Sequence, residues 1–359
     1  MAMVDSASQD EPCHRAEQGR KSVPRIHRLI PYGWLGVMVV LLLWGTPSLA
    51  DDHPPTVTQP WLAEWVNRGE FDAAWLNTLL APLTPDPRVL HLMDSQAEAK
   101  PYYLYRKNFI NAQRIQSGRE QMRLHHDLLQ RIQKKFHVPP EMLVALWGVE
   151  SDFGRHAGGF SVLRSLYTLA AHYPRRASFF QEELRQFLLL CREEGWDPQV
   201  PEGSYAGAIG QMQMMPSTLR AYAVDFSGDG KRDIFHNPSD VLASIASFLA
   251  GHEWNPGGIL SIQLNQKINP DLGTLISPSL DAMRPWQEWQ EKGIVLTAKD
   301  KKPDPNEPAA LIRLEEQQGS RYYMVFGNFK VITRWNRSSR FAMVVHELAD
   351  LLRRKPTHD

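Results

Sequence analysis

The feature that most limits the fold is a long stretch, from Pro60 to about Leu190, that reads as successive amphipathic helices with short breaks. Apolar residues that recur every three to four positions indicate helices rather than strands. Val138-Pro139-Pro140 ends one helix and starts the next, because proline lacks a backbone N–H and is accepted in a first helical turn. The chain is therefore predicted to be mainly α.

Two later segments depart from this pattern. Residues 196–217 are rich in Gly, Pro, Ser and Met, which favours irregular backbone that another group approaches closely. Leu311 to Leu314 and Arg321 to Trp335 are predicted to be strands of a small antiparallel sheet, with a turn at Gly327-Asn328. Ser338 or Ser339 then caps a final helix.

These patterns predict four parts of the chain. Residues 1–50 form a signal peptide, 51–258 a helical region, 259–336 a small β-containing subdomain, and 337–359 a helix that packs back on the helical region.

The N-terminus has the order of a secretory signal. An apolar run from Tyr32 to Trp44 follows the basic residues Arg20, Lys21, Arg25 and Arg28, and Ser48 and Ala50 supply small residues for cleavage. The run is shorter than the roughly 20 residues that a spanning helix needs. We expect export to the periplasm with cleavage after Ala50. An uncleaved membrane anchor is the alternative, so membrane association stays open.

The charge balance and the cysteines exclude one class of partner and one kind of covalent link. Lys+Arg and Asp+Glu both total 40, which leaves no basic excess of the kind that binds a phosphate backbone, so nucleic acid is excluded as a partner. Cys13 would leave with the leader, and Cys191 remains alone in an apolar helical stretch. A structural disulfide is thus excluded, and Cys191 is interpreted as an inert core residue.

Glu150 is the best candidate for chemistry. Helical spacing places it on the same face as Leu143, Leu146 and Trp147. Desolvation against apolar side chains raises the pKa of a carboxyl, as a general acid for a glycosidic oxygen requires. The alternatives are a structural glutamate bound by local donors and an exposed one at the helix end.

The segment that begins at Asp225 has the spacing of a calcium-binding loop. Oxygen ligands are available at positions 1, 3 and 5 (Asp225, Ser227 and Asp229), and Lys231 supplies a carbonyl at position 7. Position 12 is His236, a poor ligand for a hard cation. A metal-free turn rich in Gly and Asp is the alternative.

Two other motifs are rejected. His346-Glu347-Leu348-Ala349-Asp350 imitates a zinc-protease helix but has an aspartate in place of the second histidine. Ser204 lacks the Gly-x-Ser-x-Gly turn of a serine hydrolase.

Four sequence motifs together resemble the lytic murein transglycosylase B family over roughly residues 60–350. They are Glu150–Gly154, Tyr173–Arg176, Gly203–Ser217 and Ile332–Asn336. The resemblance implies a lysozyme-like helical core that cleaves the bond between N-acetylmuramic acid and N-acetylglucosamine without water, leaving a 1,6-anhydro end.

The resemblance also assigns residues. It implies that Glu150 is the only catalytic acid/base and that Ser204 and Gln213 bind the saccharide. The family has a tyrosine where Trp335 stands, so Trp335 is interpreted as a sugar-stacking residue. Asp240 is implied as the later calcium ligand, and the calcium is structural. Asp152 lies two residues from Glu150, on another side of the helix, and is interpreted as structural.

These inferences predict a periplasmic lytic transglycosylase that acts as a monomer on peptidoglycan glycan strands and needs no organic cofactor. Cell-wall synthases are the other partner class that this function allows. Two alternatives remain: a muramidase in which water attacks, and a catalytically silent peptidoglycan-binding scaffold.

Overall fold

The computed structural model describes residues 59–95, 100–297 and 299–354. The predicted signal peptide and Cys13 lie outside this part. The chain divides into two compact units, one ending at Pro82 and the other beginning at Leu83, a division that the sequence analysis did not predict. None of the helices in the described ranges combines the length and apolar character needed to span a bilayer.

The unit that ends at Pro82 contains α1 (Pro60–Asn67) and α2 (Ala73–Leu80). The side chain of Asp72 caps α2 by accepting a hydrogen bond from the backbone N–H of Trp75 at 2.8 Å. Trp65 of α1 packs against Phe71 of the segment that joins the two helices, with ring centroids 5.8 Å apart.

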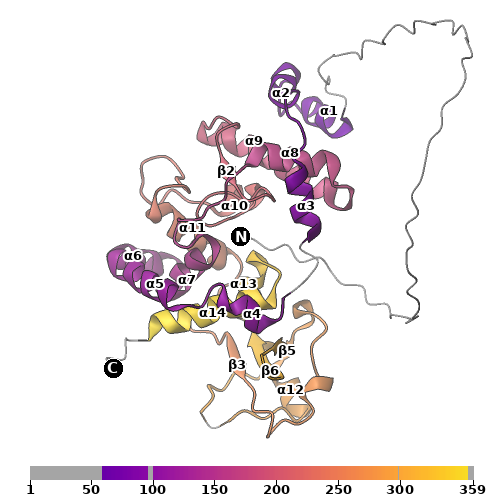
Figure 1. Cartoon of the computed structure of the whole chain (residues 1–359). Coiled ribbons are helices and arrows are strands. Elements are labelled where there is room, and N and C mark those ends of the chain that lie inside the picture. The colour runs from indigo at the N-terminus through magenta and orange to yellow at the C-terminus, as the bar shows by residue number, and fades with distance from the viewer. Residues whose placement is uncertain (1–58, 96–99, 298, 355–359) are drawn as a thin grey trace, which may run out of the picture. The chain divides into compact units, whose positions relative to one another are not determined.

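The unit that begins at Leu83 holds the remaining helices and both sheets (Figure 1). Its α-helices are α3 (Pro87–Ser95), α4 (Tyr102–Lys107), α5 (Ala112–Leu124), α6 (His126–Phe136), α7 (Pro140–Ser151), α8 (Val162–His172), α9 (Ala177–Glu194), α10 (Pro216–Tyr222), α11 (Pro238–Gly251), α12 (Trp286–Glu291), α13 (Gly327–Trp335) and α14 (Ser339–Arg353). Short 3-10 turns lie at Pro174–Arg176, Leu272–Thr274 and Leu280–Ala282. The prediction of a mainly α fold is confirmed.

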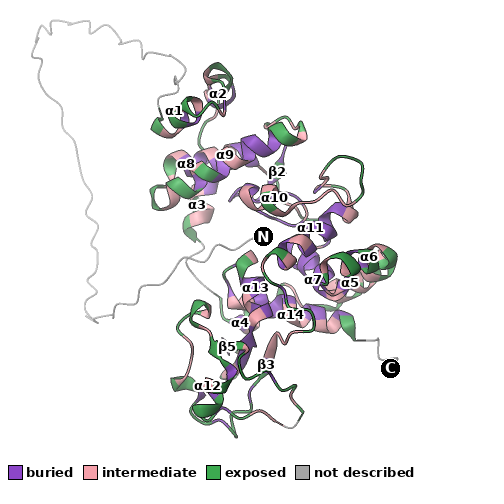
Figure 2. Ribbon diagram, turned by 180° about the vertical axis from the view of Figure 1, so that it is seen from behind, coloured by how far each residue is buried: buried purple, intermediate pink, exposed green. Residues whose placement is uncertain are grey.

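Helix α7 is the centre of this unit. Pro139 and Pro140 stand at its start, and every residue from Met142 to Ser151 is buried (Figure 2). A helix that is buried on all sides needs neighbours on all sides, and α5, α6, α11 and α14 pack around it. Glu150 is therefore held in a helix that is packed by neighbours on all sides.

The larger sheet has the strand order β3-β6-β5-β4, all antiparallel. The strands are β3 (Ser261–Gln263), β4 (Arg284–Pro285), β5 (Pro308–Glu315) and β6 (Ser320–Phe326). One face carries its own apolar cluster, in which Ile262, Leu311 and Met324 pack against Trp286 and Trp289 of α12. The cluster lies within residues 259–336, and a separate subdomain there stays a prediction.

The prediction of a strand from Arg321 to Trp335 is wrong beyond Phe326. The sheet turn lies at residues 316–319, and residues Gly327–Trp335 form α13. Asn328 explains the difference, because its amide accepts from the backbone N–H of Asn255 at 2.8 Å and donates to the Asn255 carbonyl at 2.7 Å. This distant contact outweighs the local β preference of Val331-Ile332-Thr333.

The final helix agrees with its sequence signal. Ser338 caps α14, since its hydroxyl accepts a hydrogen bond from the backbone N–H of Phe341 at 3.3 Å. The apolar side of α14 faces α7, where Leu348 lies close to Gly148.

Candidate active site

Glu150 lies in the last turn of α7 and is only 3% exposed. Burial raises the pKa of its carboxyl, because the charged form loses solvation there. This agrees with the apolar environment that the helical spacing predicted. The raised pKa favours the protonated carboxyl, which is the form that is able to donate a proton.

Trp335 makes the specific contact with this carboxyl. Its indole Nε1–H donates a hydrogen bond to Oε1 of Glu150 at 2.8 Å. This bond favours the charged form, so it opposes the larger effect of burial on the pKa of Glu150. Trp335 is the last residue of α13, and Phe248 of α11 holds its ring edge-to-face at 4.9 Å between centroids.

Asp152 has a different environment, although it is two residues from Glu150. It is in the left-handed region, with φ of 52°, where α7 ends. Burial alone would raise the pKa of Asp152, but the hydrogen bond from Arg155 and the charge of Arg114 outweigh it and lower the pKa. Arg114 lies 3.2 Å and Arg155 3.0 Å from its carboxylate. These pairs support a structural role for Asp152.

Ser204 and Gln213 lie in the loop between β2 (Glu202–Gly203) and α10. Both side chains are buried and bonded to backbone: Ser204 Oγ accepts from the N–H of Ala208 at 3.0 Å. Gln213 Nε2 donates to the carbonyls of Ala157 at 2.7 Å and Gly210 at 2.9 Å. The structure therefore places both as groups that shape this loop.

Backbone strain marks the same loop. Gln213 has a φ of 50°, a left-handed conformation that non-glycine residues seldom adopt. The two bonds of its side chain hold it there. Strain of this kind persists only where the surroundings enforce it, and it is concentrated at functional sites.

The close approach predicted for the glycine-rich segment is made by the chain itself. A Cβ on Gly203 would lie 2.1 Å from the carbonyl oxygen of Ala208, and one on Gly158 would lie 2.1 Å from the backbone of Gly203. Gly203 also pairs across the two-stranded sheet with Phe160 of β1 (Phe160–Ser161). Only glycine allows this packing of the loop against the segment that follows α7.

Gln211 is a structural residue that the sequence analysis missed. Its Oε1 accepts from the indole N–H of Trp147 at 2.9 Å, and its Nε2 donates to the carbonyl of Phe235 at 2.6 Å. It thus joins α7, the glycine-rich loop and the end of the acidic loop. Its position within Gly210–Ser217 was visible, but nothing in the sequence indicated these distant partners.

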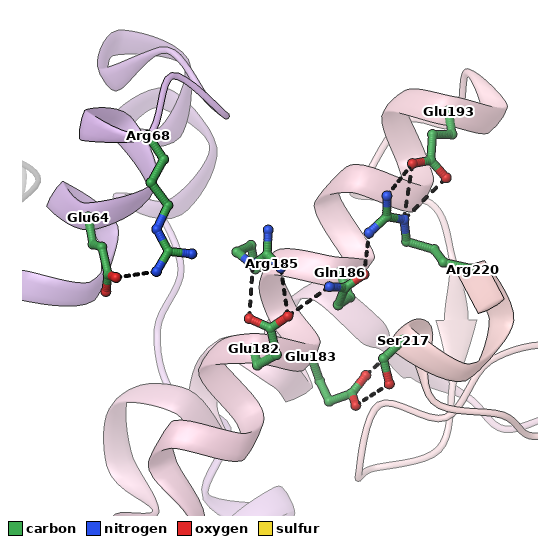
Figure 3. Close-up of polar contacts among 9 residues, drawn as sticks. All are labelled: Glu64, Arg68, Glu182, Glu183, Arg185, Gln186, Glu193, Ser217 and Arg220. Atoms are coloured by element: carbon green, nitrogen blue, oxygen red, sulfur yellow. Dashed lines mark hydrogen bonds and ion pairs between the residues drawn. The ribbon is translucent and has the colours of Figure 1, made fainter.

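The far end of the glycine-rich loop is fixed to α9 (Figure 3). Glu183 accepts from Ser217 twice, from the backbone N–H at 2.9 Å and from the hydroxyl at 2.6 Å. Burial raises the pKa of Glu183, which the two bonds from Ser217 only partly offset. Arg220, one turn further along α10, pairs with Glu193 of α9.

The acidic loop brings together the carboxylates expected to bind calcium. The carboxylate oxygens of Asp225, Asp229 and Asp240 lie within 4.8 Å of one another. Ser227 belongs to the same group, since its hydroxyl donates to Asp225 at 3.1 Å. Lys231 follows, and its N–H donates to Asp229 at 2.9 Å.

Backbone amides organise this loop. Asp225 accepts from the N–H of Gly228 at 2.6 Å and of Gly230 at 2.8 Å, and these bonds lower its pKa. Asp240, in the first turn of α11, is buried and accepts from the amides of Phe226 and Ser227, both at 2.9 Å. His236, at position 12 of the loop, is exposed. The donor set of carboxylates and a hydroxyl fits a hard cation.

Known proteins resemble this chain over most of its length. A family model described as the transglycosylase SLT domain matches residues 57–350. The membrane-bound lytic murein transglycosylase B of Escherichia coli K12 is 34% identical over 309 residues, which is 81% of each chain.

Two solved structures are also similar to this chain. The Escherichia coli lytic transglycosylase Slt35, in complex with calcium, has a TM-score of 0.74 and 34% identity, and the match covers 84% of this chain and 93% of Slt35. SltB3 of Pseudomonas aeruginosa, in complex with NAG-NAM-pentapeptide, has a TM-score of 0.71 and 32% identity over 81% of this chain and 77% of SltB3.

Proposed function

Because the chain belongs to the SLT-domain family of lytic transglycosylases, we propose that it cleaves peptidoglycan glycan strands with Glu150 as its only acid/base. The observation that carries this proposal is the buried carboxyl of Glu150, whose Oε1 is held by the indole of Trp335. Asp152 forms ion pairs with Arg114 and Arg155, so Glu150 is the one of these two carboxyls that is suited to proton transfer.

The proposed reaction needs no second carboxylate. Glu150 donates its proton to the glycosidic oxygen as the bond from C1 of N-acetylmuramic acid breaks. It then takes the proton of that sugar's C6 hydroxyl, whose oxygen forms the new bond to C1. The product is a 1,6-anhydro end, and the carboxyl returns to its protonated state.

Trp335 determines which oxygen of Glu150 carries the proton. An indole N–H is only a donor, so Oε1 must act as the acceptor of this bond. The carbonyl oxygen of a protonated carboxyl is its better acceptor, so we propose that the transferable proton is on Oε2. We propose this role in positioning Glu150 for Trp335, and the sugar-stacking role stays a prediction. Ser204 and Gln213 would present the strained loop to the saccharide.

Calcium is proposed as a structural ion of the acidic loop. Slt35, the relative in complex with calcium, is 34% identical to this chain. Asp225, Ser227, Asp229, Asp240 and the Lys231 carbonyl would hold the ion, which offsets the repulsion among three neighbouring carboxylates. The ion stiffens the loop that follows α10 and takes no part in the chemistry.

The substrate and location follow from the relatives. One relative is described as membrane-bound, which agrees with a place in the cell envelope, and we propose the periplasm as the compartment. The SltB3 complex contains a disaccharide with a pentapeptide. We therefore propose that this enzyme meets glycan strands that carry stem peptides. Synthase partners and a monomeric state stay predictions.

Product analysis tests this function. Purified sacculi are digested with the mature protein, and the released sugars are weighed by mass spectrometry. We expect anhydro ends, which are lighter by one water than the products of hydrolysis. Reducing ends would show a muramidase instead, and binding to sacculi without release would show a scaffold.

A further inference from the structure

A polar pocket lies away from Glu150. It has a volume of about 590 Å³ and lies where α4, α14, β3 and β6 meet. It is lined by His346 and Asp350 of α14 and by Arg354 just after that helix, whereas Leu348, on the opposite side of the helix, faces Gly148 of α7. Helix α14 therefore separates this pocket from the catalytic carboxyl. The volume is in the range of about 300–1,000 Å³ that is usual for ligand sites.

The floor of the pocket is prebuilt by ion pairs. Glu347 of α14 accepts from the hydroxyl of Tyr102 at 2.8 Å and from the guanidinium of Arg106. Arg321 of β6 lies 3.5 Å from Glu316 at the sheet turn. The carboxylates on the floor are thus already neutralised by protein groups.

Two cations on the rim have no such partner. Lys107, at the end of α4, and Arg354, just after α14, both line the pocket and are exposed. Neither forms an ion pair with any residue that the structure describes, and Asp350, which also lines the pocket, is paired with Arg353. The rim is therefore suited to an anion such as a carboxylate.

One wall of the pocket is an open strand edge. Strand β3 lies at the edge of its sheet, as Figure 1 shows, and its ladder bonds to β6 run through Leu260 and Leu264. Antiparallel ladders use alternate residues, so the backbone groups of Ser261 and Gln263 point away from β6. Both residues line the pocket. An extended peptide binds to such an edge through main-chain hydrogen bonds.

The length of the pocket and one buried atom also fit a peptide. The α14 residues of the wall extend from Met343 to the helix end, roughly 15 Å, and five extended residues span about 16 Å. His346 Nδ1 is buried with no hydrogen-bond partner among the described residues. An amide of a ligand, or a water that it holds, would satisfy this atom.

We propose that this pocket binds the stem pentapeptide of a peptidoglycan strand, with its backbone along β3 and its terminal carboxylate between Lys107 and Arg354. The identity of the peptide rests on the proposed function, whereas the pocket does not. Because α14 separates it from Glu150, this site would hold a peptide other than the one beside the bond being cleaved.

Calorimetric titration with the free pentapeptide, which carries no glycan, tests the site. We expect binding to the full-length protein, unchanged in Glu150→Gln, and at least tenfold weaker in the double variant Lys107→Glu, Arg354→Glu. An amidated C-terminus should weaken binding to the unaltered protein to a similar degree. Gln263→Pro removes an outward N–H and should weaken binding, whereas Gln263→Ala keeps it and should not.

Three results would overturn the proposal. The first is no binding at millimolar peptide. The second is equal binding by the charge-reversed variant in a sample whose melting curve is unchanged. The third is loss of binding in Glu150→Gln, which would place the peptide at the catalytic site. Binding of an all-L pentapeptide but not of the stem peptide would overturn the assignment of the ligand. None of these results affects the release of glycan fragments, so the proposed function is tested separately.

Discussion

The indole N–H of Trp335 and the Oε1 of Glu150 are 2.8 Å apart, although the residues are separated by 185 positions in the sequence. The contact joins the end of α13 to the last turn of α7. It couples the β-containing part of the chain to the helix that carries the proposed acid.

Removing this donor should change the pH dependence of cleavage. Trp335→Phe deletes the N–H that favours charged Glu150, so the pKa of Glu150 rises. A hydrogen bond to a charged group contributes about 1.5–3 kcal/mol, which corresponds to about one to two pKa units. The alkaline limb of the kcat/KM profile should therefore move to higher pH, with a lower kcat.

Trp335→Tyr is the matched variant, because a phenol retains a donor and the related family has tyrosine at this position. It should restore part of the original pH profile. A profile of Trp335→Phe that coincides with that of the unaltered enzyme would show that the bond does not act on Glu150.

Burial of Glu150 should also appear in stability. The pKa of Glu150 is raised in the folded state, so the contribution of this group to stability is lost as the pH rises through the folded pKa. Glu150→Gln removes that loss and keeps an acceptor for Trp335. The melting temperature of the variant should exceed that of the unaltered protein by more at about pH 8 than at about pH 5. A pH-independent difference would contradict a raised pKa.

Much of this architecture was visible in the sequence. The apolar surroundings of Glu150 follow from helical periodicity, and the cap of the final helix follows from Ser338. The structure has both features. The strand prediction failed at α13 because Asn328 is bound by Asn255, 73 positions away. Contacts of this kind, including Trp335 with Glu150, depend on tertiary packing that one sequence does not reveal.

Glu183 should anchor the glycine-rich loop. Glu183→Ala removes both hydrogen bonds to the half-buried Ser217, each of which contributes about 0.5–1.5 kcal/mol. Denaturant melts should show this loss, and cleavage should slow because the loop that holds Gln213 loosens.

Glu182→Ala is the control for this variant. Glu182 is the preceding residue on α9 and forms an exposed pair with Arg185, a kind of pair that contributes about 0–1 kcal/mol. Equal effects of the two variants would contradict the anchoring role of Glu183.

Calcium should stabilise the protein through the acidic loop. At a calcium concentration about 100 times Kd, a single site adds about 2.7 kcal/mol, which a chelator removes. We expect the melting temperature to rise with calcium in the unaltered protein and in Asp233→Asn. Asp233 accepts from the amides of Phe235 and His236 and is outside the carboxylate group.

Asp225→Asn should abolish the rise, because it removes one of the three clustered carboxylates. A melting temperature of the unaltered protein that is the same with calcium and with chelator would exclude the ion.

The most direct test of the account compares fragment release by Glu150→Gln and by Asp152→Asn. General acid/base catalysis contributes about 10²–10⁴-fold, so Glu150→Gln should lose at least about a hundredfold in rate. Asp152→Asn alters a carboxyl two residues away at the same helix end, where asparagine tolerates the left-handed conformation, and should keep most of the activity. Near-normal release by a folded Glu150→Gln, or an equal loss in Asp152→Asn, would contradict Glu150 as the only acid/base.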